Sequence, residues 1–223
     1  SSKPADVDAA RLAMFSVTEK NCWNSTWWMD PVYLGRYPQD GLALYGDAVP
    51  AGWEKDMKEI CQPLDFFGFN VYWGGKTGAG VDGRPVAVAE PLGHPLTAFQ
   101  WPVTPEVLYW APKFYYERYH LPIIVAENGM ANLDWVSADG KVHDPQRIDF
   151  LRNYLLQLQR AMSDGVPIKG FFQWSAMDNF EWAEGYKLRF GLIHVDYATQ
   201  KRTLKDSAYF YKRVVESGDL PPA

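Results

Sequence analysis

The feature that most constrains this chain is the alternation of short apolar segments with longer segments of helical periodicity. Three apolar segments predict strands, at residues 65–72, 122–127 and 168–174, and helical patterns separate them. This alternation predicts parallel strands joined by crossover helices. The strands are almost continuously apolar, which indicates that both faces of their sheet are covered. The fold class is therefore α/β, and both a doubly wound sheet and a barrel fit.

Caps and breakers predict the helix boundaries. Thr104 and Pro105 favour the start of one helix, which must tolerate or break at Pro112. Asp144 favours the start of another, and Gly165 is placed to end it. The remaining expectations are a helix over 6–19 opened by Asp6 or Asp8, mostly loop over the Trp-rich stretch NSTWWMDPVYLGRYP, a long loop over 74–103, a short fourth strand over 190–195 and a last helix over 206–216.

Composition narrows the classes of partner. Trp, Tyr and Phe together make up 16% of the 223 residues, with ten Trp. Their rings stack on sugars and line ligand clefts, but they also fill large cores. The formal net charge is −5 and Lys and Arg do not cluster, so we expect no nucleic-acid partner. No apolar run is long enough to span a bilayer, and we expect no membrane partner.

Motif searches argue against a cofactor. Neither GxGxxG nor GxxxxGK[ST] follows a predicted strand, so we expect no nucleotide, and no pattern suggests a metal. Cys22 and Cys61 form no CxxC pair and no disulfide framework. Two buried free thiols in a reducing compartment, with no visible export signal, favour a cytoplasmic location.

Each predicted strand ends in polar or aromatic residues that lead into a loop. Asn70 and Tyr72 end the first strand, Glu127 the second and Trp174 the third. This pattern favours chemistry at the carboxyl ends of the strands, as in barrel enzymes. Glu127 is then either a structural ion-pair partner or a functional carboxylate held rigidly in a cleft. The Asn128-Gly129 pair predicts a tight turn directly after it.

A second group of candidate residues lies in the segment Trp174-Ser-Ala-Met-Asp-Asn-Phe-Glu-Trp182. Here Glu181 lies between aromatic residues in the loop after a strand. A carboxylate beside indole rings can accept hydrogen bonds from sugar hydroxyls while the rings stack on the sugar. The alternative is an Asp- and Asn-rich loop whose tryptophans are partly buried for packing alone.

Four segments resemble motifs of the family 1 glycoside hydrolases, the retaining β-glucosidases. They are PIIVAENG, DFFGFNVYW, WWMDPVYLGRYP and GFFQWSAMDNFEWAEGYKLRFGLIHVDY. The resemblance extends over nearly all of this chain but only over about the C-terminal half of the family's domain. It implies that residues 1–223 form the C-terminal portion of a single (β/α)8 TIM barrel, about its last three βα units. A missing N-terminal portion, on a separate or cleaved chain, would complete the barrel as a partner.

The resemblance also implies roles for individual residues. Glu127 matches the family's nucleophile, although Ala126 stands where the family usually has Thr. Tyr72 matches the tyrosine whose hydroxyl orients that nucleophile. The implied substrate-binding residues are Asn70, Trp101 on the leaving-group side, Trp174 as a platform under the sugar ring, Glu181 and Trp182 on its hydroxyls, and Phe190 closing the pocket.

One catalytic part of the family is absent from the sequence. The family's acid/base lies in an Asn-Glu-Pro motif, and this chain contains none. The expected function is hydrolysis of terminal β-glucosyl residues from β-glucosides or cello-oligosaccharides, in company with the portion that carries the acid/base. Glu184 near the sugar loop disfavours a 6-phosphate substrate, whereas galactoside and fucoside use stays open. The alternatives are a carbohydrate-binding or regulatory fragment without turnover and a doubly wound enzyme of another class.

Overall fold

The computed structural model describes residues 2–220, and the chain divides into two compact units. The first unit comprises the residues up to Asp65, Gly75–Pro91 and Arg118–Leu121. The second comprises Phe66–Gly74, Leu92–Glu117 and the residues from Pro122 onward. All of the predicted site residues belong to the second unit, so its sheet positions the candidate site.

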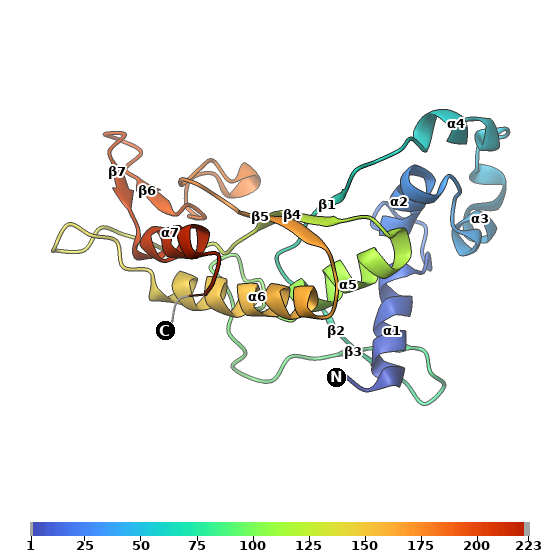
Figure 1. The fold of residues 1–223 in the computed structure, drawn as a ribbon, viewed down its shortest axis with the longest axis horizontal. Helices are drawn as coiled ribbons and strands as arrows, with labels where there is room; N and C mark the ends of the chain where they lie inside the picture. The colour runs from blue at the N-terminus through green and yellow to red at the C-terminus, as the bar shows by residue number, and fades with distance from the viewer. Residues whose placement is uncertain (1, 221–223) are drawn as a thin grey trace. The chain divides into compact units, whose positions relative to one another are not determined.

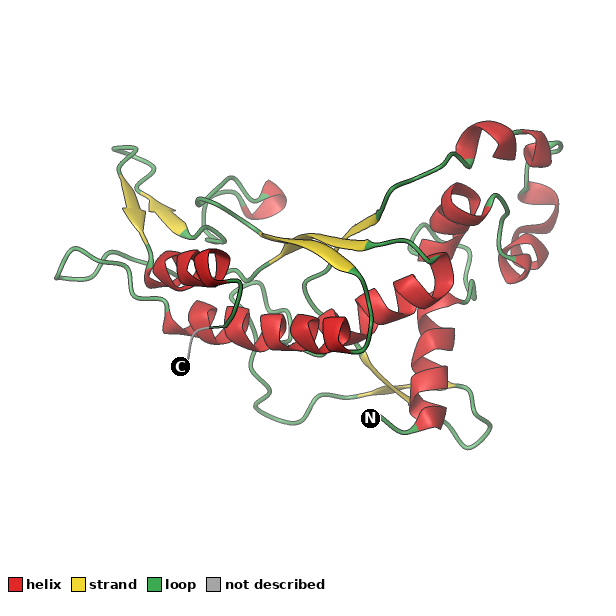
Figure 2. Cartoon of the chain, in the orientation of Figure 1, coloured by secondary structure: helices red, strands yellow, loops and turns green. Residues whose placement is uncertain are grey.

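The first unit is mostly helical (Figures 1 and 2). Its elements are α1 (Pro4–Phe15), α2 (Ser25–Leu34), α3 (Gln39–Tyr45), the 3-10 turns η1 (Gly46–Ala48) and η2 (Trp53–Lys55), α4 (Met57–Ile60) and the strands β2 (Lys76–Ala79) and β3 (Pro85–Val88). Helix α1 begins earlier than predicted because Pro4 occupies its first turn, where a fixed φ and a missing N–H suit a helix. Asp6 lies in that first turn and does not open the helix.

Two expectations for this unit were wrong. The Trp-rich stretch contains the helix α2, which continues through Pro31 and ends at Gly35 in the left-handed conformation. The long segment 74–103 is not all loop, because β2 and β3 pair as an antiparallel hairpin. A turn at Asp82-Gly83, with Gly83 at φ 79°, joins the two strands. The cysteines also differ from expectation: both are free, but Cys22 is exposed and Cys61 half-buried.

A buried ion pair helps to hold the first unit together. Asp30 is buried and accepts hydrogen bonds from the guanidinium of Arg118 and from Tyr119 Oη, the latter at 2.9 Å. The same guanidinium lies over the ring of Phe15, 4.8 Å from its centroid. Thr26 at the start of α2 donates to the Phe15 carbonyl at 2.9 Å. These contacts connect α1, α2 and residues 118–121 within the unit.

The second unit contains the predicted α/β alternation. Its elements are β1 (Phe67–Asn70), α5 (Val107–Tyr119, whose last two residues belong to the first unit), β4 (Ile123–Asn128), α6 (Pro145–Ser163), β5 (Ile168–Gln173), the 3-10 turn η3 (Trp182–Glu184), β6 (Ile193–Val195), β7 (Arg202–Leu204) and α7 (Asp206–Ser217). Strands β1, β4 and β5 form one parallel sheet in the order β1-β4-β5. The predicted crossover arrangement is therefore confirmed for these three strands.

Helix α6 follows its sequence pattern closely. It begins at Pro145 directly after Asp144 and is followed by Gly165 at φ 89°. Phe150, Leu151 and Leu158 on one face of the helix are buried, whereas Met162 near its end is exposed. Helix α6 lies beside α7 (Figure 1). Helix α5 continues through Pro112, but it begins at Val107. Thr104 Oγ1 does not cap it and instead accepts a hydrogen bond from the Gly74 amide at 3.0 Å.

The most deeply buried residues of the sheet lie in its central strand β4 and in β1. Ile123 and Val125 of β4 are fully buried, and Phe67 and Phe69 of β1 pack on Tyr115 of α5. The short strand predicted near 190–195 exists as β6, but it pairs with β7 as an antiparallel hairpin instead of joining the parallel sheet. No helix within residues 2–220 has the length and apolar character needed to cross a bilayer.

Candidate active site

The predicted pair of Glu127 and Tyr72 lies at the carboxyl ends of two neighbouring strands. Tyr72 follows β1 and Glu127 is the penultimate residue of β4, and the two strands run parallel. An irregularity in register between Phe69 and Asn70 sets Asn70 opposite Glu127. Tyr72 Oη then donates a hydrogen bond to Glu127 Oε2 at 2.6 Å. The sheet thus places a phenol directly on a half-buried carboxylate.

The protonation of Tyr72 follows from this environment. Burial raises the pKa of the Tyr72 hydroxyl well above its ordinary value, and the hydrogen bond to Glu127 raises it further. The negative charges of Glu127 and Glu181 act in the same direction. The hydroxyl therefore stays protonated at neutral pH and remains a donor to Glu127. The contribution of Glu181 indicates that both carboxylates lie near this tyrosine.

A second tyrosine, which the sequence analysis missed, holds the backbone of Tyr72. Tyr154 of α6 is fully buried, and its hydroxyl donates to the Tyr72 carbonyl at 3.1 Å. The same oxygen accepts the Thr104 amide at 2.9 Å. Burial raises the pKa of Tyr154 to about 12. Its apolar helical spacing indicated only a core position, so nothing in the sequence pointed to this contact.

Aromatic side chains surround the pair. Phe190 is buried together with Ala131 and Leu188, and Tyr72, Trp101 and Trp174 pack against this cluster. The rings of Tyr72 and Trp101 have their centroids 5.1 Å apart. Phe99, which the sequence analysis did not select, stacks on Trp101 at 4.3 Å. Four of the predicted aromatic residues therefore pack together, and one of them, Tyr72, contacts Glu127.

The other predicted site residues are more open to solvent. Glu181 is half-buried in the loop between β5 and β6, where Asn179 Nδ2 donates to its Oε2 at 3.1 Å. Trp182 is 81% exposed and opens the turn η3. Asn70 is exposed at the end of β1. The structure thus brings Tyr72 into contact both with Glu127 and with the cluster of Trp101, Trp174 and Phe190. Glu181 lies near Tyr72, and Trp182 and Asn70 are at exposed positions.

The predicted tight turn at Asn128-Gly129 is not formed. Asn128 is the last residue of β4, and its Nδ2 donates to the Val71 carbonyl at 2.8 Å. Gly129 is needed for a different reason, because the next strand approaches it closely. A Cβ at position 129 would lie 2.0 Å from the Trp174 carbonyl oxygen, closer than any real Cβ contact. The glycine therefore permits Trp174 to lie beside the end of β4.

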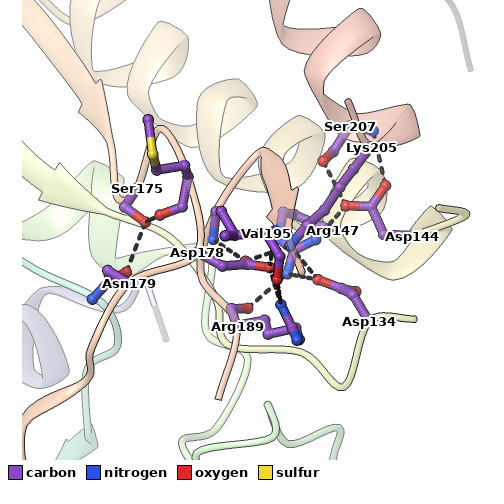
Figure 3. Close-up of polar contacts among 12 residues, drawn as sticks. Asp134, Asp144, Arg147, Ser175, Asp178, Asn179, Arg189, Val195, Lys205 and Ser207 are labelled. Atoms are coloured by element: carbon purple, nitrogen blue, oxygen red, sulfur yellow. Dashed lines mark hydrogen bonds and ion pairs between the residues drawn. The ribbon is translucent and has the colours of Figure 1, made fainter. Parts of the chain in front are cut away.

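A buried network of charged groups lies behind the loops of the site (Figure 3), and the sequence analysis missed it. Its hub is Asp178, whose Oδ1 accepts from Lys205 Nζ at 2.8 Å and from the Gly191 amide at 3.1 Å. Its Oδ2 accepts from Arg189 Nη1 at 2.5 Å and from the Val195 amide at 3.2 Å. This carboxylate therefore fixes the segment after β5 onto β6 and the loop that precedes it.

The network continues from Lys205 toward α6 and α7 (Figure 3). Lys205 Nζ also donates to Asp134 Oδ2 at 2.5 Å, and Arg147 Nη2 donates to the same oxygen at 2.7 Å. Arg147 pairs in addition with Asp144, which accepts from the Ser207 amide at 2.8 Å. These buried side chains thus connect the loops after β4 and β5 with the starts of α6 and α7.

Protonation within the network is set by burial and by neighbouring charges. Burial opposes ionisation of Asp134, but Arg147 and Lys205 outweigh it and hold the pKa of this carboxyl below its usual value. Burial, joined by the charge of Arg147, lowers the pKa of Lys205. Nothing in the local sequence signalled these pairs, because the partners come from distant parts of the chain and single charged residues usually lie at the surface.

Other features of the described residues lie away from this chemistry. A hollow of about 640 Å³ in the first unit is lined by residues that include Asp30 and Arg118, and none of the predicted site residues borders it. Its Asp30 and Arg118 already pair with each other. Within residues 2–220, no group of three or more His, Cys, Asp or Glu side chains is arranged to hold a metal ion.

The parallel sheet and the position of its polar side chains define the class of protein. Three parallel strands with connecting helices carry a carboxylate, a phenol and aromatic rings at their carboxyl ends. Side chains gather at this end of the strands in α/β barrels. The chain is therefore an α/β protein whose polar groups gather where α/β barrels carry their active sites.

The family follows from direct comparison. The chain belongs to glycosyl hydrolase family 1, whose family model matches residues 2–220. It is 43% identical to a 1,4-beta-D-glucan glucohydrolase from Thermotoga neapolitana over 99% of its own length, and 43% identical to Beta-glucosidase A from Thermotoga maritima over 86%. The resemblance found in the sequence motifs is thereby confirmed.

Solved structures support the same assignment. The β-glucosidase from Thermotoga maritima in complex with castanospermine matches with a TM-score of 0.82 and 39% identity over 99% of this chain. Its complex with glucoimidazole gives 0.81 and 41%. The chain covers only 49% and 48% of these structures, and 48% and 43% of the two relatives. It therefore spans about half the length of the curated relatives it matches.

Proposed function

We propose that this chain supplies the nucleophile and most of the sugar-binding site of a retaining β-glucosidase. The observation that carries the proposal is the 2.6 Å hydrogen bond from Tyr72 Oη to Glu127 Oε2 at the carboxyl end of the parallel sheet. A nucleophilic carboxylate must be held in a fixed orientation, and a protonated phenol that donates a hydrogen bond to it provides that restraint. Membership of glycosyl hydrolase family 1 and the β-glucosidase names of the relatives support the same reaction.

The proposed reaction has two displacements. Glu127 attacks the anomeric carbon and forms a glycosyl-enzyme ester, while a second carboxylic acid protonates the departing oxygen. That second group then removes a proton from water, which attacks the same carbon and frees Glu127. In a retaining enzyme the two carboxyl groups lie about 5–5.5 Å apart. Here Tyr72 would orient Glu127 toward the sugar through its hydrogen bond.

The side chains near this pair suit a neutral hexose. Trp174 would lie under the sugar ring, Phe190 would close the pocket and Trp101 would border the leaving group. Glu181 would accept hydrogen bonds from ring hydroxyls. The exposed Trp182 and Asn70 would complete the contacts once substrate is bound. Because the relatives are named for glucosides and glucans, a β-glucoside or cello-oligosaccharide is the proposed substrate.

The acid/base must come from elsewhere, because the sequence has no Asn-Glu-Pro motif. In the sheet β1-β4-β5, the outer strands β1 and β5 each have one edge that pairs with no other strand of residues 2–220. Open parallel edges are unfavourable unless another strand covers them. We infer that residues 1–223 are one portion of a single barrel, its last βα units. A polypeptide with the remaining strands would close both edges and bring the acid.

One alternative is favoured by the missing motif. A fragment without the acid/base could bind sugar through its aromatic side chains and not hydrolyse it. The two functions differ in the behaviour of what we call the assembled enzyme, meaning this chain together with a polypeptide that carries the remaining strands and an Asn-Glu-Pro motif. The binding alternative predicts glucoside binding without turnover even in that assembly.

The test of the proposed function is the Glu127→Gln variant of the assembled enzyme, assayed on an aryl β-glucoside. We expect kcat to fall by about 10⁴-fold or more, the scale of losing a covalent nucleophile, with binding retained. The control is Glu106→Gln, which changes an exposed glutamate in the second unit and should keep normal activity. Near-normal hydrolysis by Glu127→Gln would refute the nucleophile assignment, and an inactive wild-type assembly that still binds glucoside would favour the alternative.

A further inference from the structure

In the segment that carries Glu181, not every polar side chain belongs to the buried network. Asp178 and Asn179 are neighbours in sequence, but their side chains contact different groups (Figure 3). Asp178 is buried and accepts hydrogen bonds from Lys205, Arg189 and two backbone amides. The side chain of Asn179 instead contacts Ser175, the Phe180 carbonyl and Glu181, all in its own loop. The segment is therefore anchored on one side and polar on the other.

The hydrogen bonds of Asn179 determine which way its side-chain amide is oriented. Its Oδ1 lies 3.0 Å from Ser175 Oγ, which shares its single proton between this oxygen and the Met177 carbonyl at 2.8 Å. Its Nδ2 donates to Glu181 Oε2 at 3.1 Å. The second Nδ2 proton is directed to the Phe180 carbonyl at 3.1 Å. Only an amide oriented in this way satisfies both neighbours, because a carboxylate can accept but not donate. Turning the amide round would set its oxygen against the oxygen of Glu181.

Hydrogen bonds of its backbone fix the position of Ser175. It is buried, its amide donates to the Phe190 carbonyl at 3.2 Å and its carbonyl accepts the Leu192 amide at 3.0 Å. Ser175 thus holds the amide of Asn179 from the strand end, while Asp178 holds the adjoining backbone. The backbone of Glu181 is fixed separately by its amide hydrogen bond to the Gly185 carbonyl at 2.7 Å. What remains to be fixed is the glutamate side chain.

We propose that Asn179 is a positioning residue that holds the Glu181 carboxylate in place for sugar binding. Oε2 is held by the amide, which leaves Oε1 to accept a hydroxyl of the substrate. A glutamate side chain that is already ordered loses less rotational freedom when substrate binds. The inference rests on the proposed function, because it assumes that Glu181 contacts the sugar.

The first part of the test needs no activity. In the free chain, the side-chain amide of Asn179 is observed by ¹H–¹⁵N NMR in the wild type and in Glu181→Gln. We expect slowed proton exchange in the wild type and a clear shift in the variant. Glu184→Gln is the matched control, since Glu184 lies in the same loop and pairs with Lys187. Fast exchange in the wild type, or equal shifts in the two variants, would overturn the proposal.

The second part is a double-mutant cycle in the assembled enzyme, with aryl β-glucoside hydrolysis as the readout. Asn179→Asp sets a carboxylate against Glu181, and we expect kcat/KM to fall by about 10- to 30-fold, since a lost charge-assisted hydrogen bond and like-charge repulsion act together. In the Glu181→Gln background the new carboxylate can accept from the new amide. There we expect Asn179→Asp to change kcat/KM by less than about threefold.

The outcomes separate a positioning role from a structural one. Equal losses in both backgrounds would mean that Asn179 acts through the fold alone and would overturn the proposal. Unchanged kcat/KM in Glu181→Gln alone would contradict the sugar-binding assignment of Glu181 in the proposed function, and with it the positioning role. If no assembly hydrolyses glucoside, the proposed function fails, and the NMR experiment then decides whether Asn179 holds the carboxylate. Melting temperatures of all variants show whether each remains folded.

Discussion

At the scale of single residues, the phenol of Tyr72 holds the side chain of Glu127 in position. Burial and the hydrogen bond to Glu127 keep the Tyr72 hydroxyl protonated, so it donates at every pH at which the protein would work. Tyr154 holds the Tyr72 backbone through its carbonyl. Glu127 is thus restrained by Tyr72, and the backbone of Tyr72 is in turn held by Tyr154. The position of Glu127 is therefore set by two tyrosines, one that follows β1 and one on α6.

Replacing Tyr72 by Phe tests this restraint directly. We expect Tyr72→Phe to lower kcat/KM of the assembled enzyme by about 10- to 100-fold, since hydrogen bonds to charged groups contribute about 1.5–3 kcal/mol. Steady-state kinetics on an aryl β-glucoside measure the effect. The control is Tyr209→Phe, which alters an exposed tyrosine on α7 and should leave kcat/KM unchanged. A loss below twofold in Tyr72→Phe would show that the hydrogen bond does not act on the reaction.

At the scale of elements, the buried charges join loops that the sequence separates widely. Lys205 at the end of β7 lies between Asp134, from the loop after β4, and Asp178, from the loop after β5. All three side chains are essentially inaccessible to solvent. Burying charges is costly, but breaking a buried pair is costlier still, since it leaves a charge without compensation.

The Lys205→Met variant measures what this connection contributes. It keeps a long apolar stem and removes the ammonium group from two buried carboxylates, and we expect the free energy of unfolding to fall by about 3–5 kcal/mol. Urea denaturation followed by Trp fluorescence gives the value. Lys201→Met, at an exposed lysine just before β7, should stay within about 0.5 kcal/mol of the wild type. A similar small change in Lys205→Met would contradict the role assigned to the network.

A second link between elements depends on pH. His143 Nδ1 contacts Asp206 at the start of α7 at 2.6 Å, and Nε2 contacts Asp139 at 3.1 Å. The hydrogen bonds with Asp206 and then Asp139 raise the pKa of this imidazole. Its contribution to stability is therefore fully present below the unfolded pKa of about 6.5 and is lost as pH rises through the folded pKa.

NMR titration of the His143 ring checks this prediction. We expect its pKa to lie above about 6.5 in the wild type and to move down in Asp206→Asn, because the first partner is lost. Asp149→Asn, at an exposed carboxylate of α6, should leave the titration unchanged. An imidazole that titrates at or below 6.5 in the wild type would show that the two contacts do not persist in solution.

The sequence predicted some elements well and others poorly, for physical reasons. β4 and α6 were predictable because each combines a clear apolar pattern with residues that start or end it. Helix α2 was missed because Pro31 suggested a break, and the helix nevertheless continues through this residue. The hairpin β2–β3 was missed because its strands are short and mostly open to solvent. In such strands the alternation of apolar and polar residues is weak.

The residues of the candidate site also fall into those that the sequence pointed to and those that it did not. Glu127, Tyr72, Trp101, Trp174 and Phe190 were selected because each stands in or near a motif, and their roles stay predictions. The supporting residues were not selected. Tyr154 resembled an ordinary core residue, and Asp134, Asp178 and Lys205 resembled ordinary surface charges. Only three-dimensional contacts reveal which buried polar groups find partners, and these contacts join residues that no local pattern connects.

At the scale of the whole molecule, the chain has half the length of its relatives and a parallel sheet with two open edges. A polypeptide that supplies the remaining strands should therefore bind it. We expect native mass spectrometry to detect a one-to-one complex with the 25.4 kDa chain, and the complex to melt at a higher temperature than the chain alone. The control is the same polypeptide without its first and last strands. Equal melting temperatures with and without the intact polypeptide would contradict assembly.

The close approach at Gly129 also changes what the letters Glu-Asn-Gly mean in this sequence. The glycine is not there for a flexible turn, because its neighbour Asn128 is still in the strand and the Trp174 carbonyl lies where a side chain would begin. In a saturation library, position 129 should accept almost nothing but glycine, whereas the exposed Ala126 nearby should vary. One residue of this short motif is therefore required by the packing of a neighbouring segment of the chain.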